Sequence, residues 1–250
     1  MKESFRSLAL ALGALLQRNR QGKILFYHDL FVSRQYTDMG TPFSVFRAQM
    51  SAAEHAGFTL VSHAPTARNE VQVCLDDGFR GVYDCLEWFL GKGAYPVVFI
   101  VPDLVGTDGY LSWSEILELQ SVGFSFQSHT WSHRSLTDVA DGELAHELGD
   151  SRSFLSDKLG REVTDICFPR GLFSNRVVNA ALSAGYTNLI TSVPGAYCDL
   201  MPIACSGASS LRTRNLVQFL SPGETVSVLK GGMRFFQRHY LKRQYIQDAF

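Results

Sequence analysis

The sequence contains no Cys-x-x-Cys pair, no excess of basic residues and no Asn-x-Ser/Thr acceptor for glycosylation. Its five cysteines are an odd number, which argues against a disulfide framework and indicates a reducing compartment. The formal net charge is −1, whereas a nucleic-acid-binding protein usually has a strong basic excess. We therefore expect neither a disulfide-stapled secreted module nor a nucleic-acid partner.

The sequence also has no apolar run long enough to cross a bilayer. The longest run, residues 8–16, falls far short of the ~20 residues that a membrane span needs. Lys2 and Arg6 precede it, as in a signal peptide, but no small-residue cleavage site follows it. We expect residues 4–19 to form an amphipathic or core-capping helix. Without a convincing export signal, we expect the protein to act in the cytoplasm, with an exported form as the alternative.

Strand-like and helix-like segments alternate along most of the chain, and 46% hydrophobic residues are enough for a sizeable core. Predicted strands cover residues 23–27, 58–61, 71–75, 96–101, 124–127, 165–168, 187–190 and 211–217. Predicted helices cover residues 4–19, 41–56, 80–90, 116–121, 141–159 and 174–184. Such alternation implies a parallel sheet. About seven parallel strands in a chain of this length predict an α/β fold, a distorted (β/α) barrel.

The predicted elements divide the chain into three parts. We expect an N-terminal helical extension over residues 1–22, a barrel domain over 23–220 and a basic helix over 221–250. The segment 233–245 is rich in basic and aromatic residues, so contact with a membrane surface is one interpretation. A helix that packs on the barrel with a solvated charged face is the favoured interpretation.

Polar side chains follow several of the predicted strands. His28, Asp76, Asp77, His129 and Arg170 all stand just past a strand's carboxyl end. In (β/α) barrels, active sites gather at that face. Any one of these residues is also an ordinary loop residue, but their joint position predicts a site.

The stretch Val71-Gln-Val-Cys-Leu-Asp-Asp-Gly78 runs from an apolar strand into two adjacent carboxylates. Asp and Gly are common in turns for backbone reasons, so a solvated turn is the better interpretation of this stretch alone. Two buried like charges are costly unless a cation, or a division of labour between ligand and base, resolves the repulsion.

A pair of histidines four residues apart, His129 and His133, lies in Ser128-His-Thr-Trp-Ser-His133. On a helical turn capped by Ser128, this spacing places both imidazoles on one face. The pair alone is a weak signal, because histidine is also a common surface residue. Together with one carboxylate it makes three protein ligands and leaves positions open for water, as catalytic metal sites do.

Three motifs together resemble the polysaccharide deacetylase (NodB homology) family, carbohydrate esterase family 4. They are Leu75-Asp-Asp-Gly78, His129-Thr-Trp-Ser-His133 and Phe168-Pro-Arg-Gly171. The resemblance covers most of residues 23–193 in the family's order and spacing, and it implies a NodB-like domain over 23–220.

The resemblance also implies roles for individual residues. Asp77, His129 and His133 would hold a divalent metal, in the first place Zn²⁺, although other transition metals also fit. Asp76 would be the general base on metal-bound water. The backbone N–H of Arg170, after Pro169, would help to hold the oxyanion. The implied reaction removes an acetyl group from an N-acetylated sugar of a polysaccharide or a glycan precursor.

The sequence departs from the family's pattern in three places. Cys167 stands where the family often has an arginine that orients the base, and Arg170 replaces a usual aromatic. The late Leu-x-His motif that carries the general acid is absent, since Val226-Ser-Val-Leu-Lys230 has no histidine. His28 is our candidate for the acid or a substrate contact, although a satisfied polar residue at the barrel rim explains it equally well.

Trp113 and Trp131 offer aromatic faces that suit sugar rings, although such tryptophans more often serve in packing. We weigh three functions for the chain. The first is the N-deacetylase. The second is a metal hydrolase that acts at the same site on O-acetyl esters or on a non-sugar amide. The third is a catalytically weakened glycan-binding protein, which the absent Leu-x-His motif favours and the intact Asp76 disfavours.

Overall fold

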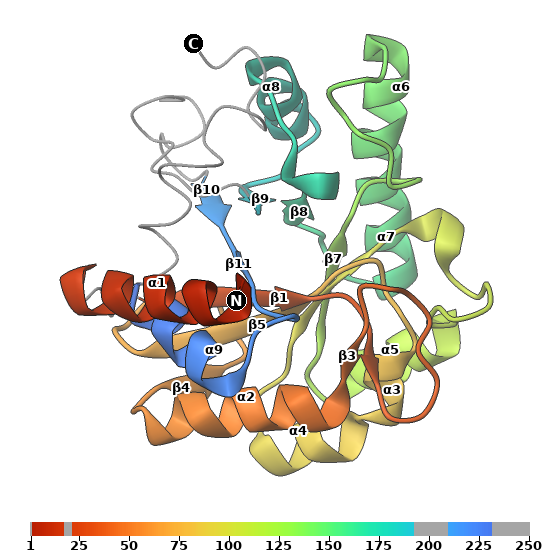
Figure 1. Ribbon diagram of the computed structural model, residues 1–250. Helices are drawn as coiled ribbons and strands as arrows, with labels where there is room; N and C mark the ends of the chain where they lie inside the picture. Colours follow the sequence, from red (N-terminus) through yellow and green to blue (C-terminus); the bar gives the residue numbers. More distant parts are fainter. Residues whose placement is uncertain (1, 18–21, 193–209, 232–250) are drawn as a thin grey trace.

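The computed structural model describes residues 2–17, 22–192 and 210–231 (Figure 1). Its main sheet is a nearly closed barrel in which every strand pairing is parallel. Along the barrel the order is β10-β9-β8-β7-β6-β5-β1-β11, and β4 pairs with β5 outside this path. The predicted α/β barrel is confirmed.

The strands match the predicted ranges within one or two residues, apart from the last range. They are β1 (Lys23–Tyr27), β4 (Thr59–Val61), β5 (Glu70–Leu75), β6 (Val97–Ile100), β7 (Ser125–Ser128), β8 (Asp165–Cys167), β9 (Asn188–Thr191), β10 (Ser210–Thr213) and β11 (Asn215–Leu216). A separate small sheet pairs β2 (Leu30–Phe31) with β3 (Thr41–Pro42). The single strand predicted over 211–217 is two strands, so the barrel path formed by the described residues has eight strands, close to the predicted number of about seven.

Arg214 separates these last two strands. β10 pairs with β9 and β11 pairs with β1, so the two strands stand at opposite ends of the barrel path. The one-residue step between them therefore lies at the gap where the barrel nearly closes.

Helices surround the sheet (Figure 1). They are α1 (Lys2–Gln17), α2 (Phe43–His55), α3 (Gly81–Asp84), α4 (Leu86–Lys92), α5 (Trp113–Ser121), α6 (Asp141–Ala145), α7 (Ser151–Leu159), α8 (Asn175–Ser183) and α9 (Pro222–Leu229). Short 3₁₀ turns cover Pro102–Leu104 and Pro169–Gly171, and a π-helical turn, His146–Asp150, joins α6 to α7. No helix among the described residues is long and apolar enough to cross a membrane. The basic segment 233–245 lies outside the described residues.

Apolar side chains of the strands alternate between two cores. On β1, Leu25 and Tyr27 join the large core beneath the helices. Ile24 and Phe26 point the other way, into a small core inside the barrel that also contains Phe99. Burial of both faces explains why the strands are near-continuous apolar runs. The small core forms the floor under the strand ends that carry the site.

Candidate active site

Asp76 and Asp77 are neighbours in sequence, but their carboxylates serve different partners. Asp76 continues the strand geometry, since its N–H donates to the Tyr27 carbonyl at 3.0 Å. The next two residues are left-handed, with φ of 68° at Asp77 and 79° at Gly78. This reversal turns the chain between the two side chains. It resolves the repulsion expected of two adjacent carboxylates, because each one meets its own set of groups.

Arg214 binds both oxygens of the Asp76 carboxylate. Arg214 Nη1 donates to Oδ1 at 2.5 Å and Nη2 to Oδ2 at 2.8 Å, and both side chains are almost completely buried. Burial alone would raise the pKa of Asp76, but the adjacent guanidinium outweighs it and holds that pKa well below its usual range. Asp76 is therefore an ionised carboxylate across the physiological pH range.

Arg214 itself rests on the small core inside the barrel. Its guanidinium carbon lies 4.3 Å from the centroid of the Phe26 ring and 5.3 Å from that of Phe99, as in cation–π contacts. Nη2 also lies 2.8 Å from Cys167 Sγ. An arginine that comes 47 residues later in the chain thus lies beside Cys167, the position at which the family resemblance led us to expect an arginine.

Asp77 faces both histidines of the predicted set. Its Oδ1 lies 3.4 Å from His129 Nε2 and 3.3 Å from His133 Nε2. The two imidazole centroids are 4.8 Å apart. The predicted convergence of these three side chains is thereby observed, although the roles assigned to them stay predictions.

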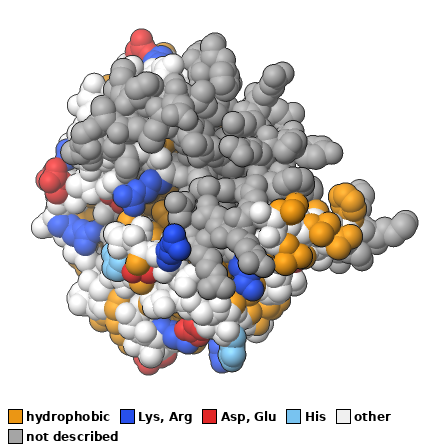
Figure 2. Space-filling view, turned by 90° about the vertical axis from the view of Figure 1, so that its left-hand side faces the viewer, with side chains coloured by type: hydrophobic (Ala, Val, Ile, Leu, Met, Phe, Trp, Pro, Cys, Tyr) orange, Lys and Arg blue, Asp and Glu red, His pale blue; other side chains and the backbone are white. Residues whose placement is uncertain are grey.

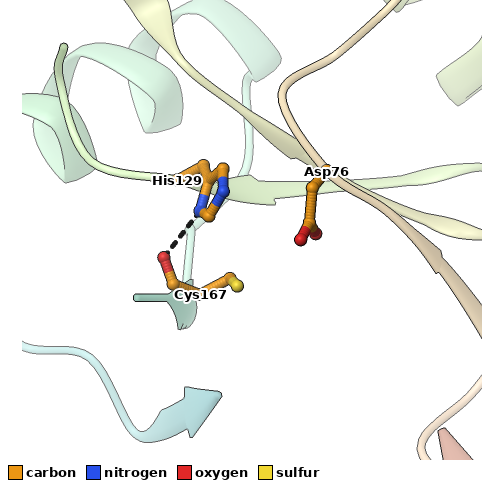
Figure 3. A group of neighbouring side chains, drawn as sticks. All are labelled: Asp76, His129 and Cys167. Carbon is orange, nitrogen blue, oxygen red and sulfur yellow. Dashed lines mark hydrogen bonds between the residues drawn. The ribbon is translucent and has the colours of Figure 1, made fainter. Parts of the chain in front are cut away.

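The tautomer of His129 suits a ligand. Its Nδ1–H donates to the Cys167 carbonyl at 2.7 Å (Figure 3). The lone pair of Nε2 is thereby left for the side of Asp77, whose Oδ1 is 3.4 Å away. Burial lowers the pKa of His129 to about 4, so the imidazole is neutral at physiological pH.

One buried oxygen without a hydrogen-bond partner indicates whether a metal ion fits between Asp77, His129 and His133. Asp77 Oδ1 is buried and has no hydrogen-bond partner among the described residues. A buried carboxylate oxygen without a partner is costly unless a cation neutralises it. Two neutral imidazole nitrogens and one carboxylate oxygen are also an ordinary donor set for a catalytic divalent metal. The residues present therefore fit such an ion.

Asp76, His129 and Cys167 form a second group of possible ligands (Figure 3). The carboxylate of Asp76 and the sulfur of Cys167 point into the same space. That space already holds a cation, because the Arg214 guanidinium contacts both side chains. Burial also raises the pKa of the Cys167 thiol well above its usual value, whereas a metal ligand must be a thiolate. We therefore assign the possible metal set to Asp77, His129 and His133.

The histidine segment is a loop, so the helical turn predicted for His129 and His133 is wrong. Thr130 and His133 have positive φ values of 67° and 62°, which no right-handed helix contains. Ser128 does not cap a helix but ends β7, and its hydroxyl accepts the N–H of Thr130 at 3.2 Å. The two imidazoles meet through this tight left-handed fold of the chain rather than through helical spacing.

The carboxylate of Glu147 holds this loop from the other side. Its Oε2 accepts the backbone N–H groups of Trp131 and Ser132 at 2.9 and 3.0 Å, and Oε1 accepts the Ser132 hydroxyl. Glu147 stands on the π-helical turn and is only 2% exposed. It fixes the segment between the two histidines.

His28 stands directly after β1, as predicted. Its Nδ1–H donates to Gln218 Oε1 at 2.8 Å, and His28 is among the groups whose proximity lowers the pKa of Asp76, after Arg214 and His129. His28 is therefore close to the candidate base and oriented by a residue that follows β11.

The Pro169-Arg170-Gly171 turn follows β8 at the same end of the barrel. Pro169 and Gly171 are buried, whereas the Arg170 side chain is exposed. Arg170 has φ 58°. A left-handed backbone costs a non-glycine residue roughly 1–2 kcal/mol and is found mainly at functional sites.

The two predicted sugar-contacting tryptophans belong to one half-buried aromatic cluster. The Trp131 ring packs against Phe154 and His146, and Trp113 also packs against Phe154, with centroid distances of 4.8–5.6 Å. Trp131 lies between the two histidines in sequence, whereas Trp113 begins α5. Their contact with a sugar stays a prediction.

Sequence reasoning missed four residues that shape the site. Arg214 gave one weak signal, because it is one of two arginines inside the strand predicted over residues 211–217. Glu147 and Gln218 gave none, because their partners are distant in sequence. Tyr110 was also missed. Its ring stacks on Phe79 at 4.7 Å, and burial, followed by the charge of Asp77, raises the pKa of its hydroxyl.

Comparison with known proteins agrees with this geometry. A family model described as polysaccharide deacetylase matches residues 63–189, about half of the chain. The fold and the strand-end cluster thus define a deacetylase-type barrel, and the chain belongs to the polysaccharide deacetylase family, carbohydrate esterase family 4.

One curated relative is YxkH of Bacillus subtilis, a protein named for polysaccharide deacetylation. It is 24% identical over 184 residues, which cover 69% of this chain. The chain spans only 65% of the length of that relative.

Two solved structures share the fold. One is the deacetylase PplD of Streptococcus pyogenes in complex with acetate, with TM-score 0.70 and 20% identity over 84% of this chain and 98% of PplD. The other is the polysaccharide deacetylase BC0361 of Bacillus cereus, with TM-score 0.70 and 22% identity over 84% of this chain and 69% of BC0361. At these identities the likeness establishes the fold.

Proposed function

We propose that this protein is a metal-dependent hydrolase that removes an N-acetyl group from a sugar of a polysaccharide or a glycan precursor. One observation carries the proposal. The unpartnered Asp77 oxygen faces two imidazole nitrogens, directly beside a second carboxylate that Arg214 keeps ionised. Family membership supports the deacetylation of a carbohydrate. PplD, which shares the fold, is a deacetylase whose structure was solved in complex with acetate.

Asp77, His129 and His133 would hold the divalent cation, with Zn²⁺ as the first candidate. Such an ion polarises a carbonyl and lowers the pKa of water to ~7. The Nδ1 hydrogen bond of His129 to Cys167 fixes the ring so that Nε2 faces the cation position.

Asp76 is the candidate general base. Its low pKa makes it a weak base, so it can work only on water that is already unusually acidic. The two hydrogen bonds from Arg214 use one lone pair of each carboxylate oxygen, and each oxygen keeps a second lone pair for a proton. Asp76 thus accepts the proton from water while Arg214 holds the carboxylate in place.

His28 is the candidate general acid. An amine leaves only when it is protonated, and α9 carries no histidine where the family has its Leu-x-His motif. His28 lies near Asp76, and Gln218 orients its ring. It donates its proton to the sugar nitrogen from the side of β1.

The remaining predicted residues contact the acetyl group and the sugar. The backbone N–H of Arg170 stabilises the oxyanion, and donors of this kind typically contribute ~3 kcal/mol to transition-state stabilisation. Pro169 shapes the wall of the turn. Trp131 and Trp113 contact sugar rings outside the reacting unit. The cytoplasmic place of action stays a prediction.

Acetate release from an acetylated chito-oligosaccharide tests the proposal. We expect chelation to abolish release and Zn²⁺ or a similar ion to restore it. Asp76→Asn should abolish turnover and retain the bound metal, whereas Asp77→Asn should lose the metal. Full activity of a preparation shown to be metal-free would refute the mechanism.

The absent Leu-x-His motif favours a second candidate, hydrolysis of O-acetyl esters at the same site. An alcohol leaving group depends less on protonation than an amine does, so an ester needs the general acid less. Matched N-acetyl and O-acetyl substrates separate the two: a preference for the ester that His28→Gln leaves unchanged would favour the esterase. A third candidate, a glycan-binding protein, would bind oligosaccharide without turnover and with equal affinity in the Asp76→Asn variant.

A further inference from the structure

Helix α1 presents large apolar side chains outward. Its five most exposed hydrophobic residues are 50–73% exposed. They are Phe5, Leu8, Leu12, Leu15 and Leu16. At 3.6 residues per turn these positions form a single stripe about 100° wide along the helix. In Figure 2, hydrophobic side chains gather on the part of the surface that projects to the right, where α1 lies.

This stripe is not the face by which α1 joins the barrel. The opposite face packs towards α9 and buries Leu10 and Ala14. It is also fixed by charge: Arg6 donates two hydrogen bonds to Glu224 at 2.8 and 3.1 Å, and the Ser7 hydroxyl donates a third at 2.8 Å. These three hydrogen bonds to Glu224 therefore hold the helix in the orientation that places its leucines on the outer face. A helix that is apolar on both faces is ordinarily covered on both.

The charge of the chain is segregated around this helix. Residues 1–28 contain five Lys or Arg and one Glu, and no acidic residue follows Glu3 before Asp29. Residues 29–231 contain fourteen cations and twenty-two anions, and residues 232–250 four cations and one anion. Arg6 is paired with Glu224 on the opposite face and Lys23 is buried in β1, so the charge for headgroups comes from Lys2, before the stripe in sequence, and from Arg18 and Arg20, after it.

We propose that the outer face of α1 docks on an anionic lipid surface. An amphipathic helix binds such a surface through buried apolar area and through attraction of its cations to anionic headgroups. The stripe supplies the apolar area, and Lys2, Arg18 and Arg20 supply the complementary charge. Two other occupants are disfavoured, because both a second copy of α1 and the basic segment 232–250 would bring like charges together.

Co-sedimentation of the full chain with lipid vesicles tests this docking. One set of vesicles is phosphatidylcholine alone, and the other is phosphatidylcholine mixed with anionic phosphatidylglycerol. The test variant is Leu12→Glu with Leu15→Glu. The matched control is Leu90→Glu with Leu117→Glu, two leucines that are 39% and 45% exposed on α4 and α5. Both variants add the same charge, so only its placement differs.

We expect the protein to bind the anionic vesicles more tightly than the neutral ones, and added salt to weaken this binding. The α1 variant should lose roughly tenfold or more of its vesicle affinity, and the control should stay within about twofold of the unmodified protein. Thermal melts of both variants check that the barrel remains folded.

Three outcomes would overturn the proposal. The protein could stay in solution with both kinds of vesicle, or the two double variants could lose binding equally. The third is a concentration-dependent dimer that the α1 variant dissociates, since a second copy would then be the occupant of the stripe.

Discussion

Arg214 and Asp76, 138 residues apart in sequence, form a buried two-point ion pair at the mouth of the barrel. An arginine fork matches a carboxylate at both oxygens, and so fixes the orientation of Asp76 as well as its charge. The pair exists because the chain steps from β10 to β11 at this residue and directs the guanidinium into the barrel.

The first prediction concerns the shape of this pair. Arg214→Lys keeps the positive charge but cannot bind both oxygens, so Asp76 loses its fixed orientation. We expect kcat to fall by about a hundredfold with little change in KM, because small misplacements of a catalytic group have effects of this size. Steady-state kinetics measure kcat and KM of this variant, and a measurement of bound metal shows whether the metal site is retained.

Arg161→Lys is the control for this substitution. Arg161 donates to Ser125 at the start of β7, which is the other end of the barrel, and its replacement should leave both constants unchanged. Equal kinetics of Arg214→Lys and the unmodified protein would show that a positive charge beside Asp76 is sufficient for activity and that two-point binding is not needed. Arg214→Met, by contrast, leaves a buried carboxylate unpaired and should lower stability by about 3–5 kcal/mol.

The second prediction follows from the 2.8 Å contact between Arg214 Nη2 and Cys167 Sγ. An arginine placed at 167 starts beside Asp76, so Cys167→Arg should restore part of the activity that Arg214→Ala removes. Cys167→Arg alone should be harmful, because it brings two guanidinium groups together. The double-mutant cycle should be strongly non-additive. Additive losses would mean that the two positions do not share one role.

The fold was predictable because its signals are local. β1 is a short apolar run between Gly22 and His28, and its observed bounds equal the predicted ones. The capping box at the start of α5 is equally local, since Ser112 and Glu115 are three residues apart and make both of its hydrogen bonds. The meeting of two histidines with a carboxylate was also predictable, since strand ends in a parallel barrel meet at one face. The choice of Asp77 rather than Asp76 came from the family resemblance.

The parts that the sequence did not predict depend on contacts between distant segments. Arg214 finds Asp76 only because β11 pairs with β1 at the gap of the barrel. Glu147 resembles any acidic helix residue until α6 and the π-helical turn bring it under the histidine loop. The left-handed Thr130 and His133 have no local signature, so a four-residue spacing suggested a helix that does not form.

The third prediction concerns Glu147. Glu147→Gln keeps the size of the side chain, but an amide has only one acceptor oxygen for the three donors of the loop. The segment between His129 and His133 should loosen, and we expect affinity for Zn²⁺ to fall by about 10–100-fold. Competition titration with a chelating dye measures it. Glu143→Gln, a change at an exposed carboxylate on α6, is the matched control. Unchanged affinity in both variants would assign Glu147 a role in folding alone.

The fourth prediction concerns Gly78. An added Cβ would stand 2.8 Å from Ile100 Cδ1, and the φ of 79° strains any side chain. We expect Gly78→Ala to lower the free energy of unfolding by about 1–3 kcal/mol. Gly142→Ala on α6, where nothing lies within 4 Å, should instead be stabilising by about 0.5–1 kcal/mol. Denaturant titrations of the two variants measure both changes in the free energy of unfolding. Ile100→Val added to Gly78→Ala separates the causes, because it relieves the contact and leaves the backbone strain.

The last prediction concerns the pH dependence of the Arg6–Glu224 ion pair, which holds α1 against the barrel. Burial raises the pKa of Glu224, but hydrogen bonds from Arg6, the Ser221 N–H and Ser7 outweigh it and lower the pKa from 4.5 to about 2. A carboxyl whose pKa is lower in the folded state stabilises that state fully above the unfolded value, and this contribution disappears as the pH falls through the folded value. We therefore expect Glu224→Gln to lower the free energy of unfolding by about 1–2 kcal/mol at pH 7, a figure reduced for the partial exposure of Arg6.

The difference between the two proteins should shrink as the pH falls from about 4.5 towards 2, since protonated glutamate and glutamine then make equivalent contacts. Urea titrations at a series of pH values measure this convergence. Glu162→Gln, at a 70% exposed carboxylate that pairs with Arg152, is the control and should give a small difference at every pH. A gap between Glu224→Gln and the unmodified protein that widens in acid would reverse the sign of the linkage. The bond between Arg6 and Glu224 would then not be what fixes α1 to the barrel.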